Sequence, residues 1–269
     1  MPKSGESELD YDFLTDYLSL TRKDISILHR AFRKIDLRNS GMLEFDEFCV
    51  RLRCEPTLFL ETVFGFFSSA RNGNFMALNF SEFALFSCFF LTLDEAGLAH
   101  YLYIILVSND VGVHMSKNKL LSVANLQHNV VTLFGKAMGD KAKVHKWLTK
   151  VDADKNGLVT AAEFVGCCTR FKSLLFPVVR YQLDMRERIV RPSYWELKSG
   201  LGNKLLPNIT EVRDDLHSLL RDQRRMLRHP DLADGELVRS SQSKDPDDED
   251  QEREVDGIAL CVESDENVP

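Results

Sequence analysis

The feature that most constrains the fold of this chain is a twelve-residue polar segment, 152–163, between two stretches with helical periodicity. Its residues are Asp-Ala-Asp-Lys-Asn-Gly-Leu-Val-Thr-Ala-Ala-Glu, with oxygen-bearing side chains at the first, third and fifth positions and a glutamate at the last. Gly157 occupies the sixth position, where the lack of a Cβ permits a left-handed turn. The apolar residues at helical spacing on either side are Val144, Trp147, Leu148, Val151, Phe164 and Val165. The pattern predicts a helix, a tight loop and a second helix.

This segment resembles the calcium-binding loop of the EF-hand family at every fixed position. The resemblance implies that the loop binds Ca²⁺, a hard cation that takes roughly six to eight oxygen ligands. Asp152, Asp154 and Asn156 would supply side-chain oxygens, Leu158 its backbone carbonyl, Thr160 a hydroxyl or a bridging water, and Glu163 both carboxylate oxygens. Val159 is expected to pair with its counterpart in a neighbouring loop through a short antiparallel contact.

A second segment, 36–47, matches the same pattern less well. It keeps Gly41 at the sixth position and Leu43 at the eighth, between helical patterns on both sides. Arg38 stands at the third position, and a guanidinium has donors but no acceptor, so it removes a ligand and adds positive charge. The weaker second calcium site predicted here consists of Asp36, Ser40, Met42, Glu44 and Glu47. The glutamate at the ninth position partly compensates for the arginine.

Two more units complete a repeat of the helix-loop-helix pattern. The units are aligned on Glu47-Phe48, Glu82-Phe83, Lys119-Leu120 and Glu163-Phe164, which are separated by 35, 37 and 44 residues. The extra residues of the last interval are placed in 127–139.

Neither of these two units is expected to bind calcium. In the second unit Arg71 takes the first position and Met76 takes the place of the glycine. In the third unit Ser108, Asp110 and Gly112 fall at the first three ligand positions, but a lysine replaces the final glutamate.

The sequence therefore predicts an all-α fold with two pairs of EF-hand units, similar to the calmodulin and calcineurin-B type of arrangement. The predicted parts are a first pair at 20–92, a second pair at 93–171, a helical extension at 172–239 and a disordered acidic tail at 240–269. In the extension, helices are expected over 171–190, where Pro177 marks a start or a kink, and over 210–229. Residues 241–269 hold 11 acidic side chains against Lys244 and Arg253, a composition too polar to form a core.

The composition of the 269 residues is that of a globular protein with a net charge of -7. The apolar stretches are too short or too polar to span a bilayer, and no secretory signal or lipid anchor is visible. The six cysteines have no paired ligand spacing, which favours reduced, buried thiols and a cytoplasmic protein.

No enzymatic motif is recognisable, and we expect a protein that is not an enzyme. The seven histidines lie in no nucleophile or metal-ligand pattern, and there is no P-loop or dinucleotide fingerprint. Nucleic-acid binding is not expected, because the basic residues lack a binding module and stacking aromatics.

Two functions remain open from the sequence. The first is a calcium-dependent sensor, adaptor or regulatory subunit that binds a protein partner through an amphipathic helix. The alternative is a constitutive scaffold, with a cytoskeletal or ciliary association possible, in which calcium only stabilises the fold. Phe86, Phe89 and Phe90 place aromatics on more than one face of a helix, and this predicts a partner groove in the first half of the chain. The C-terminal helix could instead fold back into that groove.

Overall fold

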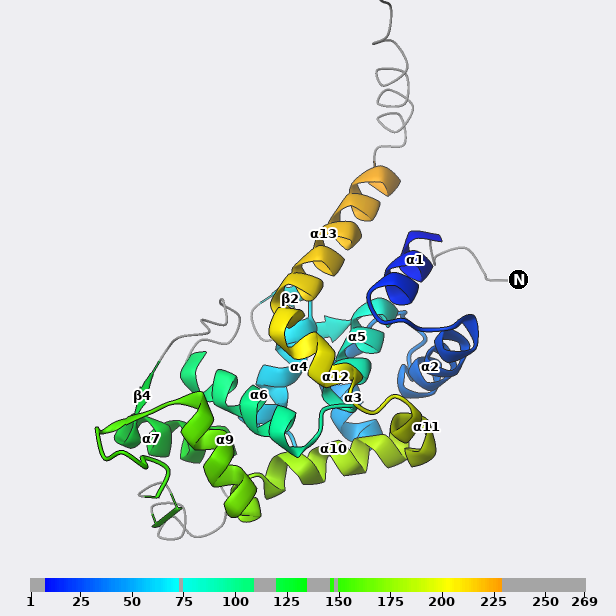
Figure 1. Ribbon diagram of the computed structural model, residues 1–269. Helices are drawn as coiled ribbons and strands as arrows, with labels where there is room; N and C mark the ends of the chain where they lie inside the picture. Colours follow the sequence, from blue (N-terminus) through cyan, green and yellow to red (C-terminus); the bar gives the residue numbers. More distant parts are fainter. Residues whose placement is uncertain (1–7, 73–74, 109–119, 135–145, 148–149, 229–269) are drawn as a thin grey trace, which may run out of the picture. The chain divides into compact units, whose positions relative to one another are not determined.

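The computed structural model describes residues 8–72, 75–108, 120–134, 146–147 and 150–228. Within these ranges the chain is mostly helical with five short strands, so the predicted all-α class is confirmed at that coarse level (Figure 1). The chain divides into two compact units, residues 1–222 and 223–269. The predicted acidic tail at 240–269 lies outside the described residues.

The first half begins with two helices and a strand and ends in a helix, α5, whose residues are almost all buried. The elements are α1 (Glu8–Asp16), α2 (Arg22–Ile35), β1 (Leu43–Glu44), α3 (Phe45–Leu52), α4 (Leu58–Phe67), β2 (Ala70–Asn72), β3 (Phe75–Leu78) and α5 (Phe80–Phe90). Both α2 and α3 follow the predicted helical patterns. Val50 of α3 is apolar but 72% exposed, so the helical spacing of apolar residues does not by itself place it in the core.

The second half repeats this alternation and then continues as helices alone. The elements are α6 (Glu95–Ser108), β4 (Leu121–Ser122), α7 (Val123–Phe134), β5 (Leu158–Val159), α9 (Ala161–Arg170), η2 (Lys172–Leu174), α10 (Phe176–Ile189), α11 (Pro192–Leu197), α12 (Leu201–Leu205), η3 (Leu206–Asn208) and α13 (Ile209–Arg228). Pro177 lies in the first turn of α10, where its missing N–H has no helical partner to lose, so it marks a start and not a kink.

Three helices start with the same reciprocal cap. The side-chain oxygen of the N-cap residue accepts a hydrogen bond from a backbone N–H three residues later, and the acidic side chain there accepts one from the N-cap backbone. The pairs are Thr21 with Asp24 in α2, Asn79 with Glu82 in α5, and Thr160 with Glu163 in α9. These local patterns explain why the helices begin where they do.

Short antiparallel strands join the loops. Leu43 of β1 pairs with Leu78 of β3, and Leu121 of β4 pairs with Val159 of β5. The predicted antiparallel contact of Val159 is therefore confirmed. Leu43, Leu78 and Val159 are the eighth residues of their twelve-residue segments, counted from 36, 71 and 152.

This register shows that the sequence alignment of the third unit is wrong. If Leu121 is the eighth residue of its segment, the twelfth is Asn125, six residues after the predicted Lys119. Ser122 then takes the capping position, and its Oγ accepts a hydrogen bond from the backbone N–H of Asn125 at 3.2 Å. The extra residues therefore precede the third loop, and not 127–139, of which Gln127–Phe134 belong to α7.

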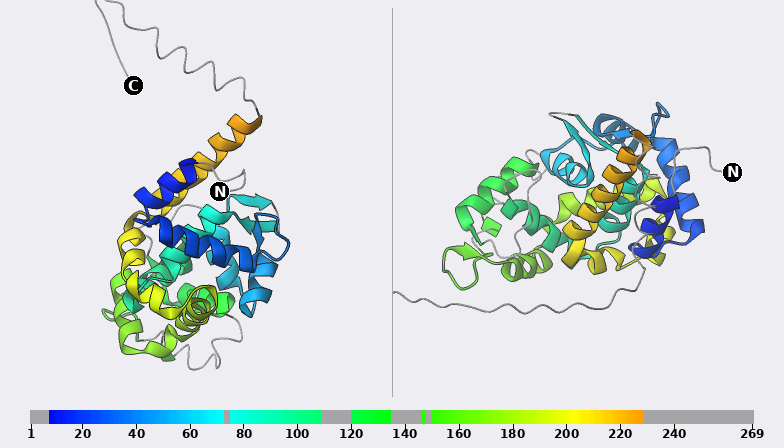
Figure 2. Two further views of the ribbon diagram at one scale, coloured as in Figure 1. Left: turned by 90° about the vertical axis from the view of Figure 1, so that its right-hand side faces the viewer. Right: turned by 90° about the horizontal axis from the view of Figure 1, so that it is seen from above.

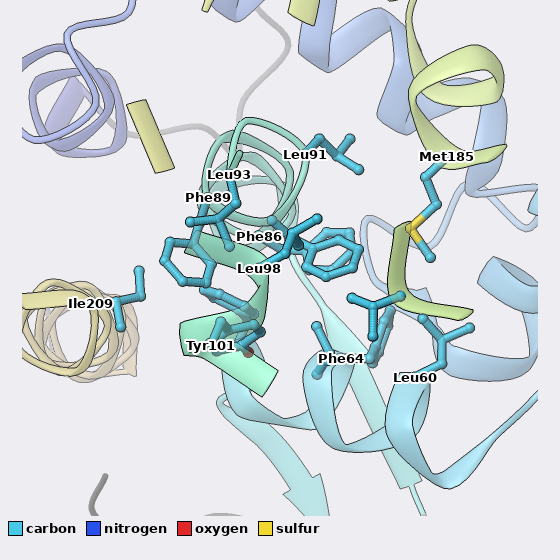
Figure 3. Close-up of a cluster of buried hydrophobic side chains, with 14 of the residues drawn as sticks. Leu60, Phe64, Phe86, Phe89, Leu91, Leu93, Leu98, Tyr101, Met185 and Ile209 are labelled. Atoms are coloured by element: carbon cyan, nitrogen blue, oxygen red, sulfur yellow. The ribbon is translucent and has the colours of Figure 1, made fainter. Parts of the chain in front are cut away.

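The aromatic residues of α5 lie in the core of the chain. Phe86, Phe89 and Phe90 are fully buried, and Figure 3 shows side chains from α4, α6, α10 and α13 around them. The ring of Tyr101 meets that of Phe89 edge to face, with 4.9 Å between centroids. The predicted partner groove is therefore not open at these phenylalanines in this structure, because the chain itself covers them.

The helices after residue 171 attach to the end of α5 by polar contacts to the backbone. Gln182 Nε2 donates to the carbonyl oxygens of Phe90 and Leu93 at 2.8 and 2.9 Å. Gly202 N donates to Thr92 Oγ1 at 2.6 Å, and α12 packs closely against α5 (Figure 2). The two bonds from Gln182 satisfy carbonyls at and just after the end of α5, and the bond to Thr92 satisfies the backbone N–H of Gly202.

The described cysteines are free thiols, as the sequence predicted. Cys49, Cys88, Cys167 and Cys168 are buried and Cys54 is half-buried, whereas Cys261 lies outside the described residues. Burial raises the pKa of Cys49 and of Cys88 to about 12. Such thiols are poor nucleophiles near neutral pH.

Among the described residues, no single helix is both long enough and apolar enough to cross a bilayer. Only α5 and the Glu95–Val107 part of α6 reach the required length and hydropathy, and they do so together, with a bend of 118° between them.

Candidate metal centre

The twelve-residue segment 152–163 forms a turn that leads through β5 into α9. Val151, directly before it, is 1% exposed, and Val159 within it is fully buried, so the turn is anchored in the core on both sides. Lys155 and Gly157 have positive φ values of 59° and 81°. The glycine therefore occupies the left-handed position that the sequence predicted for it.

Three predicted ligand residues converge in this loop. One carboxylate oxygen from each of Asp152, Asp154 and Glu163 lies within 4.8 Å of the others. Asp152 and Glu163 are half-buried and Asp154 is exposed. Like charges held this close repel one another, and a hard divalent cation with oxygen ligands would relieve the repulsion. The donor set therefore fits Ca²⁺.

Backbone N–H groups hold the first carboxylate in place. Asn156 N donates to Asp152 Oδ1 at 3.1 Å, and Gly157 N donates to Asp152 Oδ2 at 2.9 Å. Because both oxygens accept from the middle of the loop, the turn and the position of the carboxylate depend on each other.

The amide of Asn156 is turned toward its neighbours in the loop. Its Nδ2 donates to Asp154 Oδ2 at 2.7 Å, and its Oδ1 accepts from Leu158 N at 2.7 Å. A ligand role for Asn156 requires only that the same oxygen also face an ion, since a carbonyl oxygen has two lone pairs.

Glu163 joins the two ends of the loop. Its Oε2 accepts from Thr160 N at 3.0 Å and Thr160 Oγ1 at 2.8 Å, and its Oε1 accepts from Ala153 N at 3.1 Å. The hydrogen bonds from Thr160, followed by those from the start of the loop, lower the pKa of Glu163. The group is therefore an anion at neutral pH, as a metal ligand must be.

The weaker segment 36–47 has a similar backbone but a different interior. Ser40 N and Gly41 N donate to the two oxygens of Asp36 at 3.1 and 2.8 Å, as in the other loop. Leu37 N donates to Glu47 Oε1 at 2.6 Å. Ser40 Oγ donates to the carbonyl oxygen of Met42 at 2.7 Å, so two further predicted ligands bond to each other.

The arginine at the third position forms an ion pair across this loop. Arg38 Nη1 lies 2.6 Å from Glu44 Oε1. The sequence predicted Glu44 as a ligand that compensates for Arg38. In the structure Glu44 forms an ion pair with Arg38 instead. Oε2 of Glu47 is buried and has no hydrogen-bond partner among the described residues.

The other two loops hold no cluster of this kind in the described part of the chain. In the second unit Glu82 is fully buried, and its oxygens accept from Ser69 N and Asn79 N, both at 2.8 Å. In the third unit Asp110, Gly112 and Lys119 lie outside the described residues, and Ser108 is the last residue of α6.

One contact at the site was not found from the sequence. Tyr103 of α6 donates a buried hydrogen bond of 2.7 Å to the carbonyl oxygen of Val159. It ties the loop to a helix more than fifty residues earlier in the chain. Helix α6 is apolar on all its faces, which favours burial of Tyr103, but nothing local to Tyr103 indicates its partner.

No protein-family model matches this chain, and no curated protein matches it in sequence. The function of this chain is therefore inferred from its residues and their geometry.

Proposed function

We propose that this chain is an EF-hand protein that binds one calcium ion in the loop 152–163. The observation that supports the proposal most directly is the convergence of three carboxylates, from Asp152, Asp154 and Glu163, at the spacing of the EF-hand loop. Leu158 would add its carbonyl oxygen and Thr160 a hydroxyl or a bridging water. Thr160 also caps α9, which places the bidentate Glu163 at the end of the loop.

The strand pairing supports an arrangement of four EF-hand units in two pairs, at 20–92 and 93–171. In each pair the two loops would touch through their eighth residues. The contacts between Leu43 and Leu78 and between Leu121 and Val159 have this form. The segment from 172 onward would be an addition to the two pairs.

The proposal is tested by calcium titration calorimetry on the full chain. We expect one bound ion in the wild type and no measurable binding in Glu163→Gln, because an amide offers one oxygen where a carboxylate offers two. Glutamine also serves at the third position of a capping box, so the start of α9 is preserved. Glu187→Gln, at an exposed position of α10, is the matched control and keeps the site intact.

Two results would contradict the proposal. One is a wild-type chain that takes up no calcium at millimolar concentration. The other is a Glu163→Gln chain that binds with unchanged stoichiometry and affinity.

We further propose that the protein is a non-enzymatic adaptor or regulatory subunit whose partner is another protein. A partner helix would need an apolar surface that calcium exposes. A dye that fluoresces on apolar surfaces measures this directly, and new dye binding on calcium addition is the expected result for a sensor.

The second candidate function is a constitutive scaffold in which calcium stabilises the fold. The complete burial of Phe89 and Phe90 beneath the chain's own helices favours it, because the place of a partner helix is already taken. Under this alternative, calcium raises the melting temperature without any change in dye binding.

A further inference from the structure

A cleft of about 680 Å³ lies between α6, the first turn of α9 and the segment formed by η3 and α13. The course of these elements can be followed in Figure 1. None of the three residues of the carboxylate cluster, Asp152, Asp154 and Glu163, lines this cleft. Its volume falls within the range of roughly 300–1,000 Å³ that is typical of sites for small organic molecules.

The inner part of the cleft is apolar. Tyr103 and Val107 of α6 and Ile209 of α13 line it, and all three are buried. Leu206 and Ala161 extend this apolar lining toward the opening. A hydrocarbon or aromatic group placed here would leave water for an apolar surface, and this transfer favours binding in proportion to the apolar area that is buried.

The opening of the cleft is acidic. Glu211 and Asp214 lie three residues apart on α13, on neighbouring turns of the same face, and both are exposed. Asp214 Oδ1 accepts from Arg213 at 2.6 Å, which leaves the carboxylate of Glu211 as the less compensated charge. His100 is the one side chain among the lining residues that can become a cation.

We propose that this cleft binds a small amphipathic organic cation, with its apolar part against Tyr103, Val107 and Ile209 and its ammonium group beside Glu211. The polar groups of the opening fix the direction of such a ligand, and the apolar wall supplies most of the binding free energy. Ala161 is the one lining residue that belongs to the segment 152–163, and none of the predicted calcium ligands lines the cleft, so the two proposals can be tested separately.

The test compares three ligands of equal chain length and different charge: decylammonium, decanol and decanoate. Each is titrated by calorimetry into the full chain with a calcium chelator present, below its critical micelle concentration. We expect one decylammonium per chain, weaker binding of decanol, and the weakest binding of decanoate, which the carboxylates repel.

Two variants connect the binding to this cleft. Val107→Phe fills the apolar part and is expected to weaken all three ligands at least tenfold. Glu211→Gln changes an exposed side chain only, so it keeps the fold, and it is expected to weaken decylammonium about two- to fivefold while leaving decanol unchanged. Val50→Phe, at a position 72% exposed and outside the cleft, is the control for added bulk.

Three outcomes would overturn the inference. They are an absence of decylammonium binding, equal affinity for decanoate, and wild-type affinities for decylammonium in both Glu211→Gln and a correctly folded Val107→Phe. Unfolding of Val107→Phe, seen by circular dichroism, leaves the ligand series and Glu211→Gln to decide. Because chelator is present throughout, a failed calcium titration and a failed ligand titration remain distinct results.

Discussion

The ring of His217 in α13 lies against Glu82 of α5, with 3.5 Å between Nε2 and Oε1 of the glutamate. The same Nε2 lies 3.0 Å from the carbonyl oxygen of Phe67, the last residue of α4. Glu82 is the twelfth residue of the segment 71–82. This is the position at which the EF-hand pattern has its bidentate ligand. The carboxylate is fully buried and bonded to backbone N–H groups. A helix of the extension therefore covers Glu82, and under the proposed EF-hand arrangement it would occupy the place that an ion needs in the segment 71–82.

This contact predicts a loss of stability in acid. Burial, the largest effect, lowers the pKa of His217, against the opposing effects of the Phe67 carbonyl and the Glu82 charge. The folded chain thus binds this proton less readily than the unfolded chain, and the free energy of unfolding decreases as the pH falls below about 6.5 and through the lowered pKa. We expect His217→Gln to flatten this part of the pH profile.

The measurement is urea unfolding of the wild type and of His217→Gln at pH 7.5 and pH 5.5. His100→Gln, at an exposed position, is the control and should keep the wild-type slope. An equal loss of stability on acidification in the wild type and in His217→Gln would rule out this histidine as the cause.

A pair of glycine substitutions separates backbone strain from packing. Gly157 has a φ of +81° and nothing within 4 Å of the position of an added Cβ, so Gly157→Ala costs backbone strain alone, about 1–2 kcal/mol of unfolding free energy. Gly166 lies inside α9, also with room for a methyl group, and Gly166→Ala should stabilise by about 0.5–1 kcal/mol. Urea unfolding in chelator measures both. Equal effects of the two changes would contradict the assignment of a left-handed residue in the loop.

The close approach of α12 to α5 is tested at Gly202. An added Cβ would collide with the carbonyl oxygen of Phe89 and the backbone nitrogen of Leu93, which cannot move as a side chain can. We expect Gly202→Ala to lower the free energy of unfolding by roughly 1–3 kcal/mol and to raise the exposure of the aromatic core to an apolar dye. Gly166→Ala serves as the control, and a Gly202→Ala chain of wild-type stability would exclude the tight contact.

The first loop should gain a calcium site when its arginine is replaced. Arg38→Asp removes the cation that is paired with Glu44 and adds an oxygen at the third ligand position, next to Asp36 and Glu47. Calorimetry is expected to show two bound ions in place of one. Arg33→Asp, which adds the same charge on the exposed side of α2, should leave the number at one. If both variants bind one ion, the arginine is not what weakens this loop.

The elements that local sequence accounts for depend on neighbours along the chain. Thr21 and Asp24 are three residues apart, and their side chains and backbone alone define the start of α2. In the same way, Asp152, Asp154 and Glu163 belong to one twelve-residue segment, whose turn at Gly157 brings their carboxylates together. Local spacing therefore sufficed to select the candidate ligands.

The predictions that the structure corrected required knowledge of distant contacts. The third unit was aligned on Lys119 because a polar residue before an apolar one recurs throughout the chain, and the pairing of Leu121 with Val159 shows the alignment to be wrong. The exposure of Phe89 and Phe90 also could not be judged locally. Helical spacing shows which faces of a helix are apolar, but not what covers them.

The sequence by itself determined the helical class, the caps of the helices and the chemistry of the loop 152–163, because each of these arises from residues within a few turns of one another. Only the tertiary structure decided that the extension buries the aromatic side of α5, that His217 lies against Glu82, and that Arg38 pairs with Glu44 across its loop. The physical reason is that burial and charge pairing depend on which surfaces meet when the chain folds, and these surfaces come from residues far apart in the sequence, such as Glu82 and His217, which are 135 positions apart.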